Sequence, residues 1–147
     1  MSDPNTVEIR RRLPAPVAEV FRWWTDPDLV ATWMAPVGEV EASIDLRVGG
    51  EFRIVMRGPG TVIEHVGTFL EVQRPRRLVF TWSSPYTGPR PSVVTVELEA
   101  AGSDDTELRL LHTGLPEETA PSHGGGWGLM LTRLEGMLQG LEVANGD

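Results

Sequence analysis

Hydrophobic residues near the C-terminal end of the chain recur at steps of four and three: Trp127, Leu131, Leu134, Leu138 and Leu141. This spacing places them on one face of a helix and predicts a helix over about residues 122–141. Met130 and Met137 widen the stripe, and the polar residues between them are expected to face away: Thr132, Arg133, Glu135 and Gln139. A stripe this wide needs a large apolar partner surface.

Most of the preceding chain alternates apolar and polar residues, which is the pattern of half-buried β-strands. The predicted strands cover residues 6–13, 40–44, 52–56, 61–72, 78–82, 94–98 and 108–112. Turn residues separate them, as at Gly58-Pro59-Gly60. Gly67 interrupts the longest strand and predicts either a bulge or a close approach of another segment.

Two short helices are predicted between the first and second strands. Pro16 suits the first turn of a helix, and Asp26 followed by Pro27 repeats the start signal as a capping residue and a first helical position. Apolar residues at helical spacing follow each start: Val17, Val20, Phe21 and Trp24, then Leu29, Val30, Trp33 and Met34. Helix capping explains Asp26 and Asp28 better than acid/base chemistry does.

Consecutive strands with tight turns form an antiparallel meander. The sequence therefore predicts an α+β fold: a curved antiparallel sheet of about six to seven strands that grips a long C-terminal helix, with two short helices after the first strand. A strongly curved sheet and a cylindrical helix do not match along their whole length, so a cavity between them is expected.

Composition adds limits to this picture. The length of 147 residues predicts a single domain over residues 1–147. The absence of cysteine excludes disulfides and thiolate chemistry, and a net charge of −8 argues against binding to nucleic acid or to anionic membranes. Because residues 1–6 are polar, we expect a cytoplasmic protein. The basic run Arg10–Arg12 fits an exposed strand.

A family resemblance extends over nearly the whole chain, from about Val7 to Leu141. Its segments are Ala15-Pro16, Val20-Phe21, Trp24–Pro27, Trp33-Met34, Asp45–Phe52, Leu78–Trp82, Val94–Val96, His112–Leu115, Gly126-Trp127, Leu131 and Leu134. In their order and spacing, the chain resembles the START-like, helix-grip superfamily called SRPBCC. It is most similar to the branch named after the C-terminal domain of the activator of Hsp90 ATPase.

This resemblance implies a hydrophobic cavity between sheet and helix, in a superfamily whose members bind lipids, polyketides, hormones and other apolar molecules. Some related branches are aromatase/cyclases or hydrolases. The eukaryotic activator carries a separate N-terminal domain with no counterpart here, so an interaction with Hsp90 is not implied. The chain departs from the family pattern at His123-Gly124-Gly125-Gly126. Its glycine triplet is expected just before the helix, where it would loosen the mouth of the cavity.

Two histidines fall on the strand faces predicted to point inward. An inward imidazole at His65 or His112 could bond a ligand or act as an acid or base near neutral pH. The alternative at both positions is a histidine at the edge of the core, bonded to backbone. His123 is expected on a solvated loop.

Other catalytic or cofactor sites find little support in the sequence. The histidines lack short metal-ligand spacing, and Glu51 and Glu64 belong to the outward phase of their strands. Ser83, Ser84 and Ser92 lie outside any nucleophile-elbow motif, and a chain without lysine holds no Walker-type phosphate site. No metal and no cofactor is expected.

The remaining candidates are inward apolar residues that fill the core or surround a cavity. With the two histidines, the predicted ligand-binding set is Trp33, Phe52, Ile54, Met56, His65, Phe69, Phe80, Trp82, Val94, Val96, His112, Trp127, Met130 and Leu131. Trp82, Trp127 and Met130 are the strongest candidates, because tryptophan and methionine favour adaptable apolar sites.

Three functional hypotheses follow. The first is a protein that binds an apolar or lipid-like small molecule in a cavity between sheet and helix. The second is an enzyme of the polyketide cyclase or hydrolase kind that uses His112 or His65. The third is a protein-interaction module, such as a stress-related or chaperone-linked homodimer.

Overall fold

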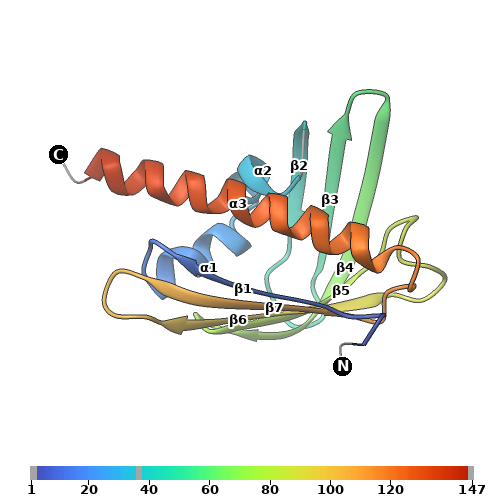
Figure 1. Ribbon diagram of the computed structural model, residues 1–147, viewed down its shortest axis with the longest axis horizontal. Coiled ribbons are helices and arrows are strands. Elements are labelled where there is room, and N and C mark those ends of the chain that lie inside the picture. Colours follow the sequence, from blue (N-terminus) through green and yellow to red (C-terminus); the bar gives the residue numbers. More distant parts are fainter. Residues whose placement is uncertain (1–2, 36–37, 146–147) are drawn as a thin grey trace.

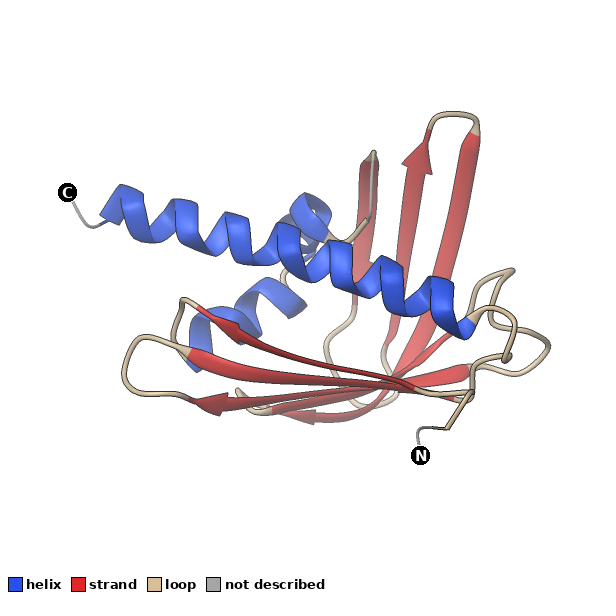
Figure 2. Cartoon of the chain, in the orientation of Figure 1, coloured by secondary structure: helices blue, strands red, loops and turns tan. Residues whose placement is uncertain are grey.

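The computed structural model describes residues 3–35 and 38–145, with side chains as far as residue 140. It contains one seven-stranded antiparallel sheet in the order β1-β7-β6-β5-β4-β3-β2. The long helix α3 crosses the concave side of this sheet (Figures 1 and 2). The predicted α+β helix-grip fold is confirmed.

The strands are β1 (Val7–Leu13), β2 (Glu39–Ile44), β3 (Glu51–Gly58), β4 (Thr61–Gln73), β5 (Arg77–Trp82), β6 (Ser92–Ala100) and β7 (Thr106–Thr113). The helices are α1 (Val17–Thr25), α2 (Pro27–Trp33) and α3 (Ala120–Asn145).

The two short helices begin where the sequence predicts. Pro16 occupies the N-cap position of α1. Asp26 caps α2, because its carboxylate accepts the backbone N–H of Asp28 at 2.9 Å, and Pro27 takes the first helical position. At α2 the two residues reduce the unpaired donors of the first turn, because Asp26 accepts one N–H and Pro27 has none.

Helix α3 begins at Ala120, close to the predicted start at about residue 122. Gly124–Gly126 lie inside the helix, so the expectation that this triplet precedes the helix is wrong. Its apolar stripe is buried as expected: Trp127, Leu131, Leu134 and Leu138 are each at most 2% exposed. A Cβ atom at Gly136 or Gly140 would meet nothing within 4 Å, so these glycines do not serve close helix packing. Leu141, the last residue of the predicted stripe, lies beyond the described side chains.

A sharp bend in β4 shapes the whole sheet. The first half of β4 pairs with β3 and the second half with β5, and a register shift between Phe69 and Glu71 leaves Leu70 as a bulge. A Cβ atom at Gly67 would lie 1.9 Å from the carbonyl oxygen of Thr81 and 2.5 Å from the ring of Phe52. The predicted close approach at Gly67 is confirmed. On the hairpin side of Gly67, β3 and the first half of β4 stand away from the remaining strands and rise beside α3 (Figure 1).

Two arginines connect α3 to neighbouring elements, one to α2 and one to β1. Arg133 was expected to face away from the core, but it donates hydrogen bonds to the carbonyl oxygens of Ala35 and, at 3.3 Å, Thr32. A cation there satisfies carbonyls at the end of α2 and compensates the helix dipole. Arg11 shares the inward phase of β1 and donates to the Gly128 carbonyl oxygen of α3 at 3.3 Å.

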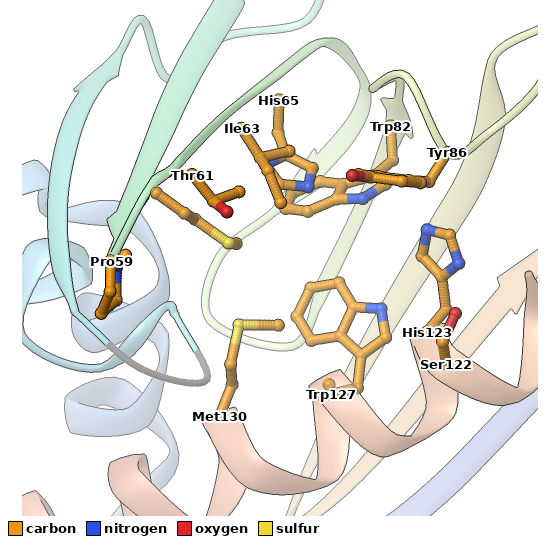
Figure 3. Close-up of a pocket in the computed structure, with 13 residues that line it drawn as sticks. Pro59, Thr61, Ile63, His65, Trp82, Tyr86, Ser122, His123, Trp127 and Met130 are labelled. Atoms are coloured by element: carbon orange, nitrogen blue, oxygen red, sulfur yellow. The ribbon is translucent and has the colours of Figure 1, made fainter.

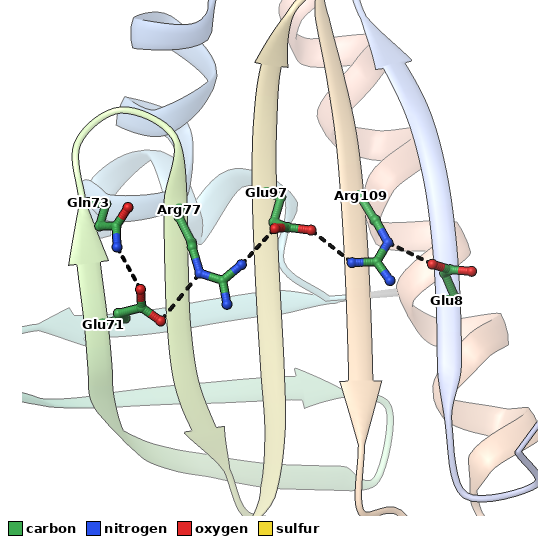
Figure 4. A network of polar contacts seen from close by, with 6 residues as sticks. All are labelled: Glu8, Glu71, Gln73, Arg77, Glu97 and Arg109. Carbon is green, nitrogen blue, oxygen red and sulfur yellow. Dashed lines mark hydrogen bonds and ion pairs between the residues drawn. The ribbon is translucent and has the colours of Figure 1, made fainter.

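The outer face of the sheet carries a row of alternating charges across five strands (Figure 4). Arg77 bonds Glu71 at 3.3 Å and Glu97 at 2.6 Å, and Arg109 bonds Glu97 at 2.8 Å and Glu8 at 2.7 Å. The hydrogen bond from Arg109 is the main reason that the pKa of Glu97 lies below its ordinary value. Pairs this exposed contribute at most about 1 kcal/mol each, so the row keeps the outer face polar more than it stabilises the fold.

Candidate functional site

A cavity of about 380 Å³ lies between the β3–β4 hairpin and the first turns of α3 (Figure 3). The hairpin contributes Met56, Gly58, Pro59, Thr61, Ile63 and His65. The helix contributes Ser122, His123, Gly126, Trp127 and Met130, and the wall is completed by Trp82 of β5 and Tyr86 of the following loop. The bend at Gly67 creates this space, because it tilts the hairpin away from the sheet while α3 stays in contact with β1.

Aromatic faces dominate the inner wall of the cavity. The ring of Trp82 lies 4.6 Å from the ring of His65, with 33° between their planes, and 5.2 Å from the ring of Trp127. Trp127 also stacks on Trp24 at 6.0 Å, so the wall continues into the core. Buried rings in mutual contact form a rigid apolar surface.

His65 lines the cavity as an uncharged imidazole. Its side chain is 7% exposed, and burial, helped by the nearby His123, lowers its pKa from 6.5 to about 4. Among the residues that the structure describes, its Nδ1 has no hydrogen-bond partner. His65 therefore stays neutral at pH 7 and contributes a flat face more than a charge.

His112 lies behind Trp127 rather than in the cavity wall. The indole N–H of Trp127 donates to Nδ1 of His112 at 3.0 Å. An indole N–H can only donate, so Nδ1 carries no proton and Nε2 must carry it. Nε2 then donates to Oγ of Ser92 at 2.7 Å, and this hydroxyl donates to the carbonyl oxygen of Trp82 at 2.6 Å. Burial, with smaller effects of His123 and His65, lowers the pKa of His112 to about 3.

The Ser92–His112 contact has the spacing of a nucleophile and its base, but its protonation is wrong for that role. A base needs a bare nitrogen facing the hydroxyl, whereas Nε2 of His112 already carries the proton. Ser92 is 1% exposed and His112 is 0% exposed, so neither meets the cavity. The chain of bonds from Trp127 to Trp82 positions two tryptophans of the cavity wall.

His123 is placed differently from the sequence expectation of a solvated loop. It lies in the first turns of α3, is partly buried and lines the cavity. Its ring packs edge-on against the ring of His112, with centroids 5.4 Å apart and planes at 87°. The expectation of a loop failed because α3 begins at Ala120. His123 therefore lies within the helix, one turn before Trp127 and on the same face.

The predicted ligand-binding residues divide into three groups. Met56, His65, Trp82, Trp127 and Met130 line the cavity. Phe52, Ile54, Phe69 and Phe80 surround a separate inner void of about 20 Å³, which has room for one water-sized molecule. The others are packed in the core: Trp33, Val94, Val96, His112 and Leu131. Ligand binding by any of them stays a prediction.

Several cavity residues escaped the sequence reasoning. Thr61 and Ile63 precede His65 in β4 by four and two residues, so they share its inward face. The alternation of the strand alone therefore predicts them. His123 precedes Trp127 by one helical step of four. Tyr86 gave no periodic signal, because it lies in an irregular loop that Thr119 holds with a hydrogen bond to the Tyr86 carbonyl oxygen at 2.8 Å.

Within residues 3–35 and 38–145, no group of three or more histidine or acidic side chains is placed to hold a metal ion. No helix in the described part of the chain is long and apolar enough to cross a membrane.

Residues 14–139 match the family described as activator of Hsp90 ATPase homolog 1-like protein. The chain belongs to this family. The match covers both short helices, β2–β7 and most of α3, and confirms the resemblance found in the sequence. No curated protein matches the chain.

Solved structures support the same assignment. Protein NE0264 from Nitrosomonas europaea is 26% identical, with a TM-score of 0.81 over 97% of this chain and 99% of that one. Protein CV1439 from Chromobacterium violaceum is 26% identical, with a TM-score of 0.79 over 92% of this chain and 98% of that one. CalU16 from Micromonospora echinospora is 32% identical, with a TM-score of 0.74 over 92% of this chain and 74% of that one.

Proposed function

We propose that this member of the family binds an apolar small molecule in the cavity between the β3–β4 hairpin and α3. The observation that carries the proposal is the cavity itself. Its volume of about 380 Å³ lies within the range of small-molecule sites, and its wall combines aromatic faces with methionine side chains. Met56 and Met130 adapt their shape readily, which suits a site that accepts related apolar molecules.

Binding can be tested with the neutral apolar dye N-phenyl-1-naphthylamine, whose fluorescence rises in an apolar site. The purified protein should bind it saturably, and native mass spectrometry should show one dye per chain. Ile63→Trp places a large ring inside the cavity and should weaken binding at least tenfold. Val62→Trp is the matched control, because Val62 is the adjacent residue of β4, 62% exposed on the other face. Absent binding, or equal binding by both variants, contradicts the proposal.

A second candidate function is an enzyme of the cyclase or hydrolase kind that uses His65. It is favoured by the position of His65 in the cavity with a strongly lowered pKa, since perturbed groups gather at catalytic sites. His112, the other candidate base, has both ring nitrogens engaged. Catalysis would be supported if the wild type releases a bound compound with altered mass and His65→Phe does not. Release of the unchanged compound would support binding alone.

We further propose that the protein acts in the cytoplasm without nucleic acid or membrane partners, in line with its charge of −8 and its lack of cysteine. The rival interaction module would need a broad apolar surface away from the cavity. The exposed Val62 and Val66 of β4 are separated on their face by Glu64, which pairs with Arg53. A homodimer remains a proposal, and light scattering after size-exclusion chromatography would test it.

A further inference from the structure

The ring of His123 presents a fixed hydrogen-bond acceptor to the cavity. Its Nδ1 lies 2.8 Å from the carbonyl oxygen of Thr119, which can only accept, so Nδ1 carries a proton. In the neutral imidazole, Nε2 is then a bare acceptor. Figure 3 shows the ring standing up from α3 toward Tyr86 and Trp82, at the cavity wall.

The surroundings hold this ring in place before any ligand arrives. His112 packs against its edge at 5.4 Å, and His112 is itself fixed by Trp127 and Ser92. Thr119, whose carbonyl fixes the imidazole, also ties down the Tyr86 loop at 2.8 Å. A preorganised acceptor costs a ligand little ordering on binding.

The electrostatics of the cavity favour an uncharged ligand. Among the lining residues that the structure describes, there is no arginine, aspartate or glutamate. Burial holds the pKa of His65 at about 4, so this ring gives no positive charge to an anion at pH 7. A carboxylate or an ammonium group would lose its hydration here without gaining a partner of opposite charge.

The wall also favours a planar molecule over a flexible chain. Trp82 contacts two other flat groups, with the ring of His65 at 4.6 Å and the ring of Trp127 at 5.2 Å. Rings pack on such faces in offset or edge-to-face arrangements that add to the gain from burial alone. His123 lines the same cavity as these rings.

From these observations, and resting on the proposed binding function, we infer that the cavity takes an uncharged planar aromatic molecule that carries a hydroxyl group, and that Nε2 of His123 accepts the hydrogen bond of that hydroxyl. His123 is thereby a specificity-determining residue of the site. The apolar surfaces bind the ring system, and the imidazole distinguishes a ring with a donor from the same ring without one.

Displacement of N-phenyl-1-naphthylamine at pH 8 tests the inference with three matched probes: naphthalene, 2-naphthol and 2-naphthoate. We expect 2-naphthol to displace the dye at roughly two- to tenfold lower concentration than naphthalene, the gain typical of one hydrogen bond. The carboxylate should be at least tenfold weaker than 2-naphthol. In His123→Phe, which keeps a ring but no acceptor, 2-naphthol and naphthalene should displace the dye at equal concentrations.

Two further variants separate a chemical effect from a structural one. His123→Gln restores an acceptor and should recover part of the preference for 2-naphthol. Leu129→Ala, at a residue of α3 that is 57% exposed, should leave the binding of all three probes unchanged. Equal affinity of the wild type for naphthalene and 2-naphthol, or an undiminished preference in His123→Phe, overturns the inference but leaves the binding function standing. Failure of the dye and of every probe to bind overturns the binding function first.

Discussion

Trp127 of α3 donates the hydrogen bond of its indole N–H to Nδ1 of His112 on β7, across 3.0 Å in the buried core. This bond decides which nitrogen of His112 carries the proton. It also connects the helix to β6 through Ser92 and to the backbone of Trp82. One polar chain therefore orients two of the tryptophans against which a ligand would pack.

Breaking this chain should destabilise the fold. In His112→Phe the ring volume is retained, but the N–H of Trp127 is left buried without an acceptor. We expect the free energy of unfolding to fall by about 1 to 3 kcal/mol, measured by urea denaturation. The double variant with Trp127→Phe removes the orphaned donor. The free energy of unfolding should fall less in the double variant than the sum of its falls in the two single variants. Strictly additive falls would show that the bond contributes nothing.

Stability should also fall on mild acidification. The pKa values of His65 and His112 are lowered by folding from 6.5 to about 4 and about 3, so between pH 6.5 and those values the unfolded chain binds more protons than the folded one. The free energy of unfolding therefore decreases as pH falls, by up to about 1.4 kcal/mol per pH unit for each histidine. Urea denaturation at pH 7 and pH 5 should show a loss of about 2 to 4 kcal/mol.

The double variant His65→Phe, His112→Phe provides the control for this acid effect. It should lose most of the dependence between pH 7 and pH 5, although its stability at pH 7 is lower. An unchanged slope would mean that neither histidine is held neutral by the fold.

Two glycine-to-alanine substitutions should have opposite effects. Gly67→Ala forces a Cβ atom against the carbonyl oxygen of Thr81, which is backbone and cannot turn aside. We expect a loss of about 3 kcal/mol or failure to fold. Gly136→Ala lies in α3 where an added Cβ meets open space, and it should raise stability by about 1 kcal/mol. Thermal denaturation of the two variants beside the wild type measures both effects.

Arg133 should contribute more to the stability of the fold than an exposed arginine does. Arg133→Ala removes the donors to the carbonyl oxygens of Thr32, in the last turn of α2, and of Ala35, just after it. We expect a loss of about 1 to 2 kcal/mol in urea denaturation. Arg10→Ala is the control, because Arg10 is exposed on β1 and pairs only weakly with Glu8 at 3.8 Å. Equal small effects of both substitutions would show that Arg133 does not secure α2.

Local signals in the chain account for most of the fold. Alternation located the strands, and the signals at Pro16 and Asp26 located the short helices, because each acts over a few neighbouring residues. Gly124–Gly126 were wrongly expected to precede α3, because three consecutive glycines resemble a loop by propensity. Packing of Trp127 and its neighbours in the core maintains the helix through them, and tertiary contact commonly overrides propensity.

The site was only partly visible in the same way. Periodicity shows which face of an element points inward, and so Met56, His65, Trp82, Trp127 and Met130 were found. It does not distinguish the wall of a cavity from the packed core, and therefore Val94, Val96 and Leu131 were chosen on equal grounds. That distinction depends on the bend at Gly67, which sets how far the hairpin stands from α3.

The sequence by itself determined the order of the elements, the inward faces and the family, because these depend on spacing along the chain. Only the tertiary structure decided the rest. It showed that Arg133 reaches α2, that His112 is held between Trp127 and Ser92, and that His123 lines the cavity. Each of these facts depends on which segments meet after folding, and on the hydrogen-bond partner that each buried polar group then finds.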